Sequence, residues 1–254
     1  MTELQVLRDA YRQHKAALLA SLQAQGASTR GIHVLLRKFS RLADGLLTTL
    51  WQRAGLPPGL TLAAVGGFGR EQLFPHSDID VLVLLPTDLP APDTVREQVE
   101  AFIRSCWDAG LEIGSSVRSV EECLSEAAND VTVQTSLLEA RRICGDAALF
   151  ARFEHQFGAQ LDPHAFLVAK TLEMRQRHTK HENTPYALEP NCKESPGGLR
   201  DLHLILWVAR AAGLGKRWDE LAHSGLATPY EVRQIQRNEA LLFLIRARLH
   251  AMAG

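Results

Sequence analysis

One stretch of the sequence constrains the fold more than any other, namely residues 64–85 with the sequence AVGGFGREQLFPHSDIDVLVLL. It begins as a short apolar run, turns on Gly66 and Gly67, and continues into a second apolar run. Apolar runs bounded by turn residues are typical of β-strands. Because residues two apart on a strand share a face, Asp78 and Asp80 are predicted to lie side by side at the start of the second strand.

This arrangement of carboxylates and glycines indicates phosphate chemistry. Two adjacent carboxylates repel each other, and a hard divalent cation such as Mg²⁺ relieves the repulsion while also binding substrate phosphates. Gly66 and Gly67 carry no side chain, so backbone N–H groups can approach phosphate oxygens there. Singly, a Gly-Gly is often only a turn, and an Asp-x-Asp is often only a solvated strand start. Together, between two apolar strands, they favour phosphoryl or nucleotidyl transfer.

The flanking segments predict helices around a small sheet. Strands are expected at residues 61–65, 78–85 and 111–117, with a helix at 94–109 between the second and the third. Residues 1–54 carry two apolar stripes at helical spacing. Further helices are predicted at 131–143, 149–157, 165–174, 199–212 and 232–252, and a loop at 182–198.

We therefore expect an α/β (α+β) fold in three parts. Residues 1–59 form a helical N-terminal arm, 60–145 a palm built on a small mixed β-sheet, and 146–254 a helical C-terminal lobe.

Composition excludes several classes of protein. The formal net charge is −1, from 28 basic and 29 acidic residues, so no overall field attracts nucleic acid. The longest apolar runs, Leu204–Ala209 and Ala240–Ile245, are far shorter than the roughly 20 residues of a membrane-spanning helix. The four cysteines lack metal-binding spacing, and the N-terminal segment is too charged for a signal peptide. We expect a cytoplasmic protein that binds neither nucleic acid nor membranes.

Two glycines, a ten-residue spacer and Asp-x-Asp together resemble the signature of the DNA polymerase β-like nucleotidyltransferase superfamily. The longer string from Gly66 to Leu85 is similar to the N-terminal nucleotidyltransferase domain of the family of bifunctional PII uridylyltransferase/uridylyl-removing enzymes. Two later segments agree with that family in the same order, namely Ser116–Arg118 and the motif KESPGGLRD at residues 193–201. The resemblance covers about residues 61 to 254.

The resemblance implies Mg²⁺-dependent transfer of UMP from UTP to a tyrosine hydroxyl of the PII signalling protein, with release of pyrophosphate. By the same resemblance, Asp78 and Asp80 are the catalytic and metal-binding carboxylates. The superfamily often has a third carboxylate on the next strand, where Gly114 aligns here and Glu112 is the nearest acidic candidate. The residues expected to bind nucleotide are Gly66, Gly67, Arg70, Ser77, Lys193 and Arg200.

Lys193 and Arg200 also have a physical rationale of their own. They flank the predicted start of a helix at Leu199, and a helix N-terminus with nearby cations suits an anion. The alternative is a capped loop whose charges pair locally.

Two alternatives to the uridylyltransferase function stay open. Nothing in the sequence selects the base, so adenylylation of a protein or small molecule by the same superfamily is one alternative. The other is a non-catalytic module that binds nucleotide or PII. The resembled family also has a His-Asp phosphohydrolase domain and sensing domains, but this sequence has no adjacent His-Asp pair. We therefore expect a chain truncated within its helical lobe, without uridylyl-removing activity or glutamine sensing.

Overall fold

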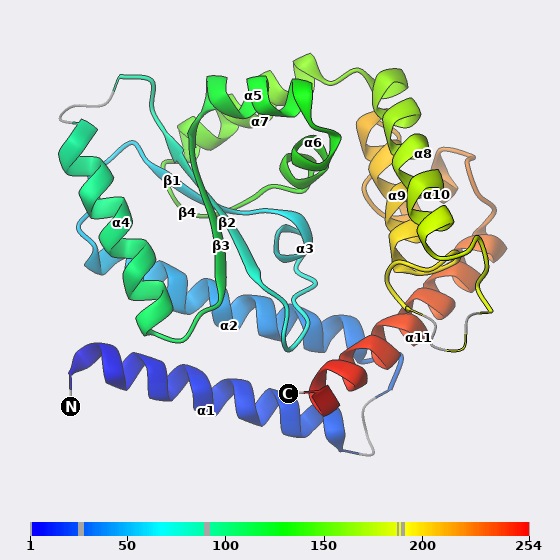
Figure 1. The fold of residues 1–254 in the computed structure, drawn as a ribbon, viewed down its shortest axis with the longest axis horizontal. Helices are drawn as coiled ribbons and strands as arrows, with labels where there is room; N and C mark the ends of the chain where they lie inside the picture. The colour runs from blue at the N-terminus through cyan, green and yellow to red at the C-terminus, as the bar shows by residue number, and fades with distance from the viewer. Residues whose placement is uncertain (1, 25–27, 89–91, 187, 189–190, 254) are drawn as a thin grey trace. The chain divides into compact units, whose positions relative to one another are not determined.

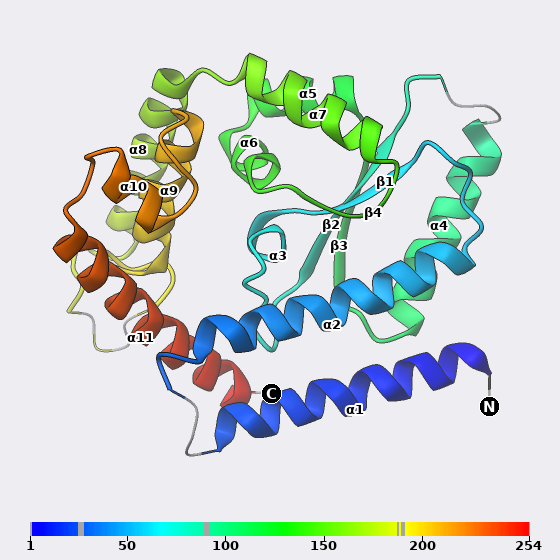
Figure 2. The ribbon, with the colours of Figure 1, turned by 180° about the vertical axis from the view of Figure 1, so that it is seen from behind.

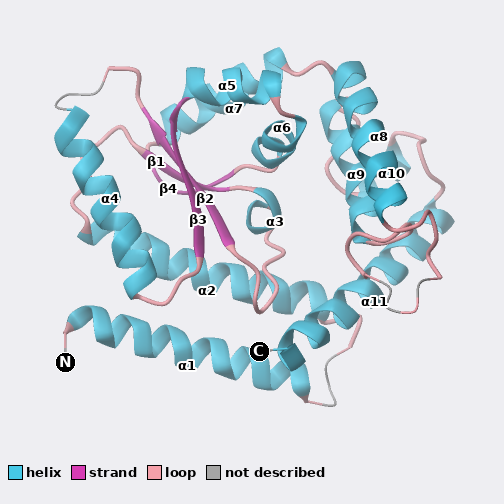
Figure 3. Ribbon diagram, in the orientation of Figure 1, coloured by secondary structure: helices cyan, strands magenta, loops and turns pink. Residues whose placement is uncertain are grey.

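The computed structural model describes residues 2–24, 28–88, 92–186, 188 and 191–253, and it contains helices around one four-stranded mixed sheet (Figure 1 and Figure 3). The expected α/β (α+β) class is confirmed. The elements in chain order are α1 (Glu3–Gln23), α2 (Ile32–Arg53), β1 (Thr61–Ala64), α3 (Gly66–Gly69), β2 (Ile79–Leu85), α4 (Pro92–Asp108), β3 (Ile113–Ser119), α5 (Val120–Asn129), α6 (Val131–Leu138), β4 (Arg141–Gly145), α7 (Ala147–Gln160), α8 (Pro163–Lys180), α9 (Leu199–Ala211), α10 (Trp218–His223) and α11 (Pro229–Ala253). Across the described ranges, no helix is long and apolar enough to cross a membrane.

The chain divides into two compact units. The first holds α1, the sheet and the helices as far as Ala159, together with α2 from Val34 onward. The second holds Gln160–Ala253 and the start of α2 as far as His33. The boundaries at residues 59 and 145 stay a prediction.

The sheet has the strand order β3-β2-β1-β4. β1 pairs antiparallel with both β2 and β4, whereas β2 pairs parallel with β3. A parallel pair needs a crossover connection, and α4 supplies it. In this register Asp80 is opposite Gly114, and Ile79 is opposite Ile113.

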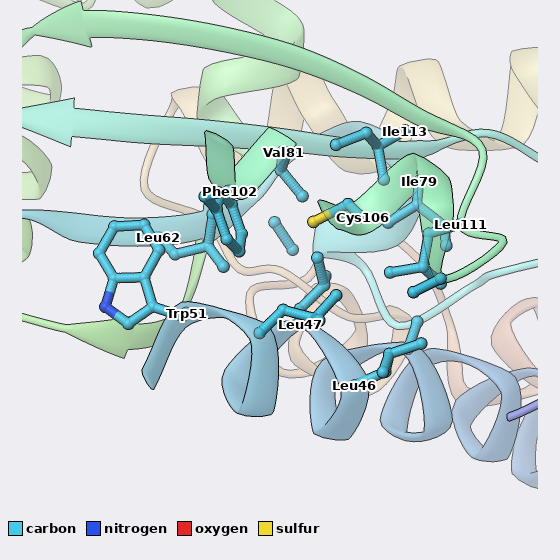
Figure 4. Close-up of a cluster of buried hydrophobic side chains, with 14 of the residues drawn as sticks. Leu46, Leu47, Trp51, Leu62, Ile79, Val81, Phe102, Cys106, Leu111 and Ile113 are labelled. Atoms are coloured by element: carbon cyan, nitrogen blue, oxygen red, sulfur yellow. The ribbon is translucent and has the colours of Figure 1, made fainter. Parts of the chain in front are cut away.

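Helices cover both faces of the sheet. α2 and α4 lie on one side, and α5, α6 and α7 lie on the other (Figure 1 and Figure 2). The core on the α2 and α4 side includes Val81 and Ile113 from the strands and a T-shaped pair between Trp51 and Phe102, with ring centroids 5.3 Å apart (Figure 4). Tyr11 from α1 belongs to the same cluster. The N-terminal helices are therefore part of the core that supports the sheet.

The predicted helix over residues 131–143 is wrong in its second half. Asp130 caps the start of α6 through the N–H groups of Thr132 and Val133, but the helix ends at Leu138 and β4 follows. β4 forms because it pairs with the edge of β1, a long-range contact that local spacing does not reveal. Gly145 has φ +88°, and a Cβ there would lie 2.3 Å from the carbonyl oxygen of Leu60, so this close approach requires glycine.

The second unit is helical, as predicted for this part of the chain. Its α8 begins at Pro163 after the N-cap Asp162, whose carboxylate accepts from two backbone N–H groups. Trp218 and Leu221 of α10 pack with Ala209 of α9 and Val232 of α11 in a small core. The predicted loop between α8 and α9 is confirmed over its described residues.

Replacement of Phe102 by alanine tests the core between α4 and α2. The side chain is fully buried and contacts Trp51, so Phe102→Ala is expected to lower the free energy of unfolding by about 3–5 kcal/mol. Trp107 on the same helix is 53% exposed, and Trp107→Ala should change stability by less than about 0.5 kcal/mol. Urea unfolding followed by circular dichroism measures both, and equal effects would contradict the core assignment.

Candidate functional site

The two predicted carboxylates lie at the start of β2. Asp78 directly precedes the strand and Asp80 is its second residue, and both are exposed while Ile79 between them is buried. The backbone continues the ladder there, because the N–H of Val65 donates to the carbonyl of Asp80 at 3.0 Å. The predicted alternation thus places both acidic side chains on the exposed face, next to the end of β1.

The carboxylate of Asp80 lies between two glycines from neighbouring elements. A Cβ at Gly114 on β3 would lie 2.8 Å from Asp80 Oδ1, and a Cβ at Gly66 would lie 3.7 Å from Asp80 Oδ2. Gly66 also has φ +55°, a left-handed conformation that favours glycine. The absence of a side chain at Gly114 leaves this carboxylate its space, whereas a Cβ at Gly66 would be in ordinary contact with it.

Gly66 and Gly67 form the first turn of the short helix α3. The N-cap residue Val65 has no side-chain oxygen that could accept from the first N–H groups of this helix. A Cβ at Gly69 would lie 2.2 Å from the carbonyl oxygen of Glu139, so the turn packs closely against the end of α6. The predicted glycine turn is therefore present beside Asp80.

Arg70 follows this turn and is engaged in an ion pair. Its guanidinium donates to the carboxylate of Glu139, which is only 4% exposed, and to Gln72 Oε1 at 2.9 Å. Its assignment as a nucleotide ligand stays a prediction. The observed contacts show that it joins α3 to the end of α6.

A second arginine braces the same turn from β4. Arg141 donates two hydrogen bonds of 3.0 Å to Asp44 on α2, and its guanidinium carbon lies 5.5 Å from the ring centroid of Phe68 in α3. Burial raises the pKa of Asp44, although Arg141 acts in the opposite direction. This pair joins α2, α3 and β4.

Ser77 and Glu112 both line a small pocket, together with Tyr11 and Lys15 of α1. Gly66, Gly67 and Asp80 are not among the residues that line it. Burial and the nearby Glu112 carboxylate raise the pKa of Tyr11 to about 12, and burial lowers the pKa of Lys15 although Glu112 opposes that shift. Glu112 is thus grouped with α1, although strand alternation would place it on the same face as Gly114.

The structure does not assemble a three-carboxylate metal centre from the predicted residues. Within the part of the chain that is described, no three His, Cys, Asp or Glu side chains cluster so that they could hold a metal ion. The prediction of Glu112 as the third ligand gains no support from this geometry. Asp78 and Asp80 therefore stand as a pair of candidate ligands.

Lys193 and Arg200 belong to the second unit, where the loop before α9 is tied together internally. The N–H groups of Leu199 and Arg200 donate to the carbonyls of Cys192 and Lys193, each at 2.9 Å. The first N–H groups of α9 are thus occupied, contrary to the rationale of an open helix terminus. Arg200 also donates to Glu194 at 3.1 Å, and Lys193 lies 3.5 Å from Glu194. The role of these two cations in nucleotide binding stays a prediction.

Asp201 is the centre of this loop network. Its carboxylate accepts from the Arg177 guanidinium, the Gly197 N–H and the His178 ring. Burial would raise the pKa of Asp201, but these hydrogen bonds outweigh it and hold the pKa below its usual value. The second half of the KESPGGLRD motif therefore has a structural role that its sequence alone left open.

Two residues near the glycine turn were not predicted from the sequence. Both Ser136 and Glu139 come from α6 and its end, and the Ser136 hydroxyl lies 3.7 Å from the position of a Cβ at Gly66. No local motif marks either residue, because α6 reaches the turn only through the tertiary fold.

Comparisons with known proteins find relatives over nearly the whole chain. A family model described as GlnD PII-uridylyltransferase matches residues 165–254. A bifunctional uridylyltransferase/uridylyl-removing enzyme of Burkholderia mallei (strain ATCC 23344) is 57% identical over 244 residues, which are 96% of this chain and 28% of that enzyme. The enzyme of the same description in Burkholderia pseudomallei (strain K96243) gives the same identity and shares.

The chain is thus related over nearly its whole length to enzymes described as uridylyltransferases, which are a class of nucleotidyltransferase. It belongs to the family of the bifunctional uridylyltransferase/uridylyl-removing enzymes. It spans 28% of the length of these curated relatives.

Substitution of Gly114 tests whether the Asp80 carboxylate occupies the space next to this glycine. In Gly114→Ala the new methyl group would lie 2.8 Å from Asp80 Oδ1, so the carboxylate must move. Because it is the exposed end of a flexible side chain, stability should change by no more than about 0.5 kcal/mol. Gly45→Ala on α2 has nothing within 4 Å and should raise stability slightly, because alanine favours helices. Urea unfolding and the ¹³C shift of the Asp80 carboxyl carbon measure the two effects. An unchanged Asp80 signal would show that the carboxylate does not lie next to Gly114.

Tyr11 provides a test through pH. Its folded-state pKa of about 12 exceeds the ordinary value of 10.0, so its contribution to stability is complete below about pH 10 and is lost as pH rises towards 12. The total loss should be about 2–3 kcal/mol. Tyr11→Phe should lack this component when urea unfolding is repeated from pH 9 to 12. Equal pH slopes for the two proteins would refute the assignment.

Proposed function

We propose that this chain transfers UMP from UTP to a tyrosine hydroxyl of a PII-type signalling protein and releases pyrophosphate. The proposal is supported by 57% identity along 96% of the chain to enzymes described as uridylyltransferases. It is also supported by the match to a family model whose description names PII. The choice of uracil as the base, of a PII-type protein as the acceptor and of Mg²⁺ as the metal ion all belong to the proposal.

The observation that carries the proposal is the position of the carboxylate pair against the glycine turn. Asp78 and Asp80 are exposed at the start of β2, and Asp80 is set between Gly66 and Gly114. Nucleotidyl transfer needs carboxylates beside a place where phosphate can approach backbone closely. Both features come from adjoining elements of the first unit.

Asp78 and Asp80 fit a hard cation chemically. Carboxylate oxygens are the ligands that Mg²⁺ takes, and one or two of them are usual when phosphates complete its shell. Bound by this pair, Mg²⁺ would neutralise charge on the triphosphate and on the leaving pyrophosphate.

The remaining steps concern the protein and its two substrates. Gly66 and Gly67 leave room for the triphosphate to approach the backbone. The acceptor tyrosine oxygen attacks the α-phosphorus and loses its proton, and the bond between the α-phosphorus and the bridging oxygen breaks. Orientation of the acceptor in line with that bond is what a folded site contributes to the rate.

Isosteric substitution of the carboxylates tests the proposal. Asp78→Asn and Asp80→Asn should each reduce transfer of label from α-labelled UTP to a PII-type protein by at least about 100-fold, because each removes a charge that the metal requires. Asp108→Asn, at the exposed end of α4, is the matched control and should retain activity. Parallel reactions with α-labelled ATP test the base.

The outcomes separate the alternatives. Label transferred from ATP in preference to UTP would replace uridylylation by adenylylation. UTP binding without transfer to PII would favour a non-catalytic module. Full activity in both asparagine variants would refute the assigned carboxylates.

A further inference from the structure

Helix α6 and its C-terminal end approach the glycine turn through two residues three positions apart, Ser136 and Glu139. Glu139 contacts the turn twice, through its ion pair with Arg70 and through its carbonyl next to Gly69. Ser136 precedes Glu139 by three residues and therefore shares its side of the helix. Its Oγ lies 3.7 Å from the position of a Cβ at Gly66, the same distance as Asp80 Oδ2. The hydroxyl and the candidate metal ligand thus flank the same glycine.

The Ser136 hydroxyl differs from most hydroxyls inside the helices of this chain. Thr135 beside it donates to the carbonyl of Val131 at 2.6 Å, and Ser40 and Thr171 bond in the same way within their own helices. Within the described residues, Ser136 Oγ has no such hydrogen bond. Since a serine in a helix usually bonds its own backbone or water, this hydroxyl is available to a ligand.

We propose that the Ser136 hydroxyl donates a hydrogen bond to a phosphate oxygen of the nucleoside triphosphate. This inference rests on the proposed function and adds a specific nucleotide contact to it. The groups of the substrate nearest Asp80 in that reaction are phosphate oxygens, and Ser136 is the hydroxyl that shares the Gly66 turn with Asp80. A neutral donor can face a polyanion without the repulsion that a carboxylate would add, and bonds to charged acceptors are stronger than neutral ones.

The variant Ser136→Ala tests this contact without endangering the fold. No hydrogen bond within the described chain is lost, and alanine is the better helix former. Ser125→Ala is the matched control, because Ser125 is an exposed serine of the preceding helix α5. Circular dichroism should show both variants folded.

Binding is measured by calorimetry on the full chain, with UTP and with inorganic triphosphate as separate probes in the presence of Mg²⁺. Loss of one charge-assisted hydrogen bond should weaken both probes about 10-fold in Ser136→Ala and neither in Ser125→Ala. In the transfer assay the KM for UTP should rise by a similar factor, with kcat nearly unchanged.

Four results would overturn the inference. Unchanged affinity of Ser136→Ala for both probes would show that Ser136 does not contact the nucleotide. Weaker UTP binding with unchanged triphosphate binding would show that Ser136 contacts the nucleoside and not a phosphate. If the wild-type chain binds neither probe, the proposed function fails as well. If Asp80→Asn abolishes transfer while Ser136→Ala leaves the KM for UTP unchanged, the serine contact alone is refuted.

Discussion

The register between β2 and β3 is the constraint on which the candidate site depends. It sets Asp80 opposite Gly114, where the absence of a side chain leaves room for the carboxylate in its present orientation. A slip of one residue would bring Ser115 opposite Asp80 and turn the apolar face of the strand outward. The core opposes such a slip, because Ile79, Val81 and Ile113 are buried against α2 and α4. Packing on one face of the sheet therefore positions the polar groups on the other.

The glycine turn is held by two arginine–carboxylate pairs that reach it from different elements. Arg70 joins it to Glu139 at the end of α6, and Arg141 joins it to Asp44 on α2. In such partly buried pairs, loss of one partner leaves the other charge without its counter-ion, which costs more than the pair itself contributes. The turn is consequently tied to two other elements of the first unit, α6 and α2.

Sequence patterns were sufficient where the physical cause is local. Alternation along β2 placed Asp78 and Asp80 on the exposed face, and glycine spacing located the turn. Patterns failed where the cause is long-range, as for β4, which forms by pairing with β1. The pairs Arg70–Glu139 and Arg141–Asp44 join residues 69 and 97 positions apart, and no short motif encodes them. Ser136 was missed for the same reason. Helix α5 was not predicted either, although its capping box, formed by Ser119 and Glu122, is a local signal that the sequence contains.

The space shared by Asp80 and position 114 also limits how this chain can vary. A Cβ at 114 and the Asp80 carboxylate in its present orientation compete for the same volume, so a side chain at 114 requires this carboxylate to turn to another position. The identity of residue 114 is therefore coupled to the orientation of Asp80, and the two positions are best compared together when sequences of this family are aligned.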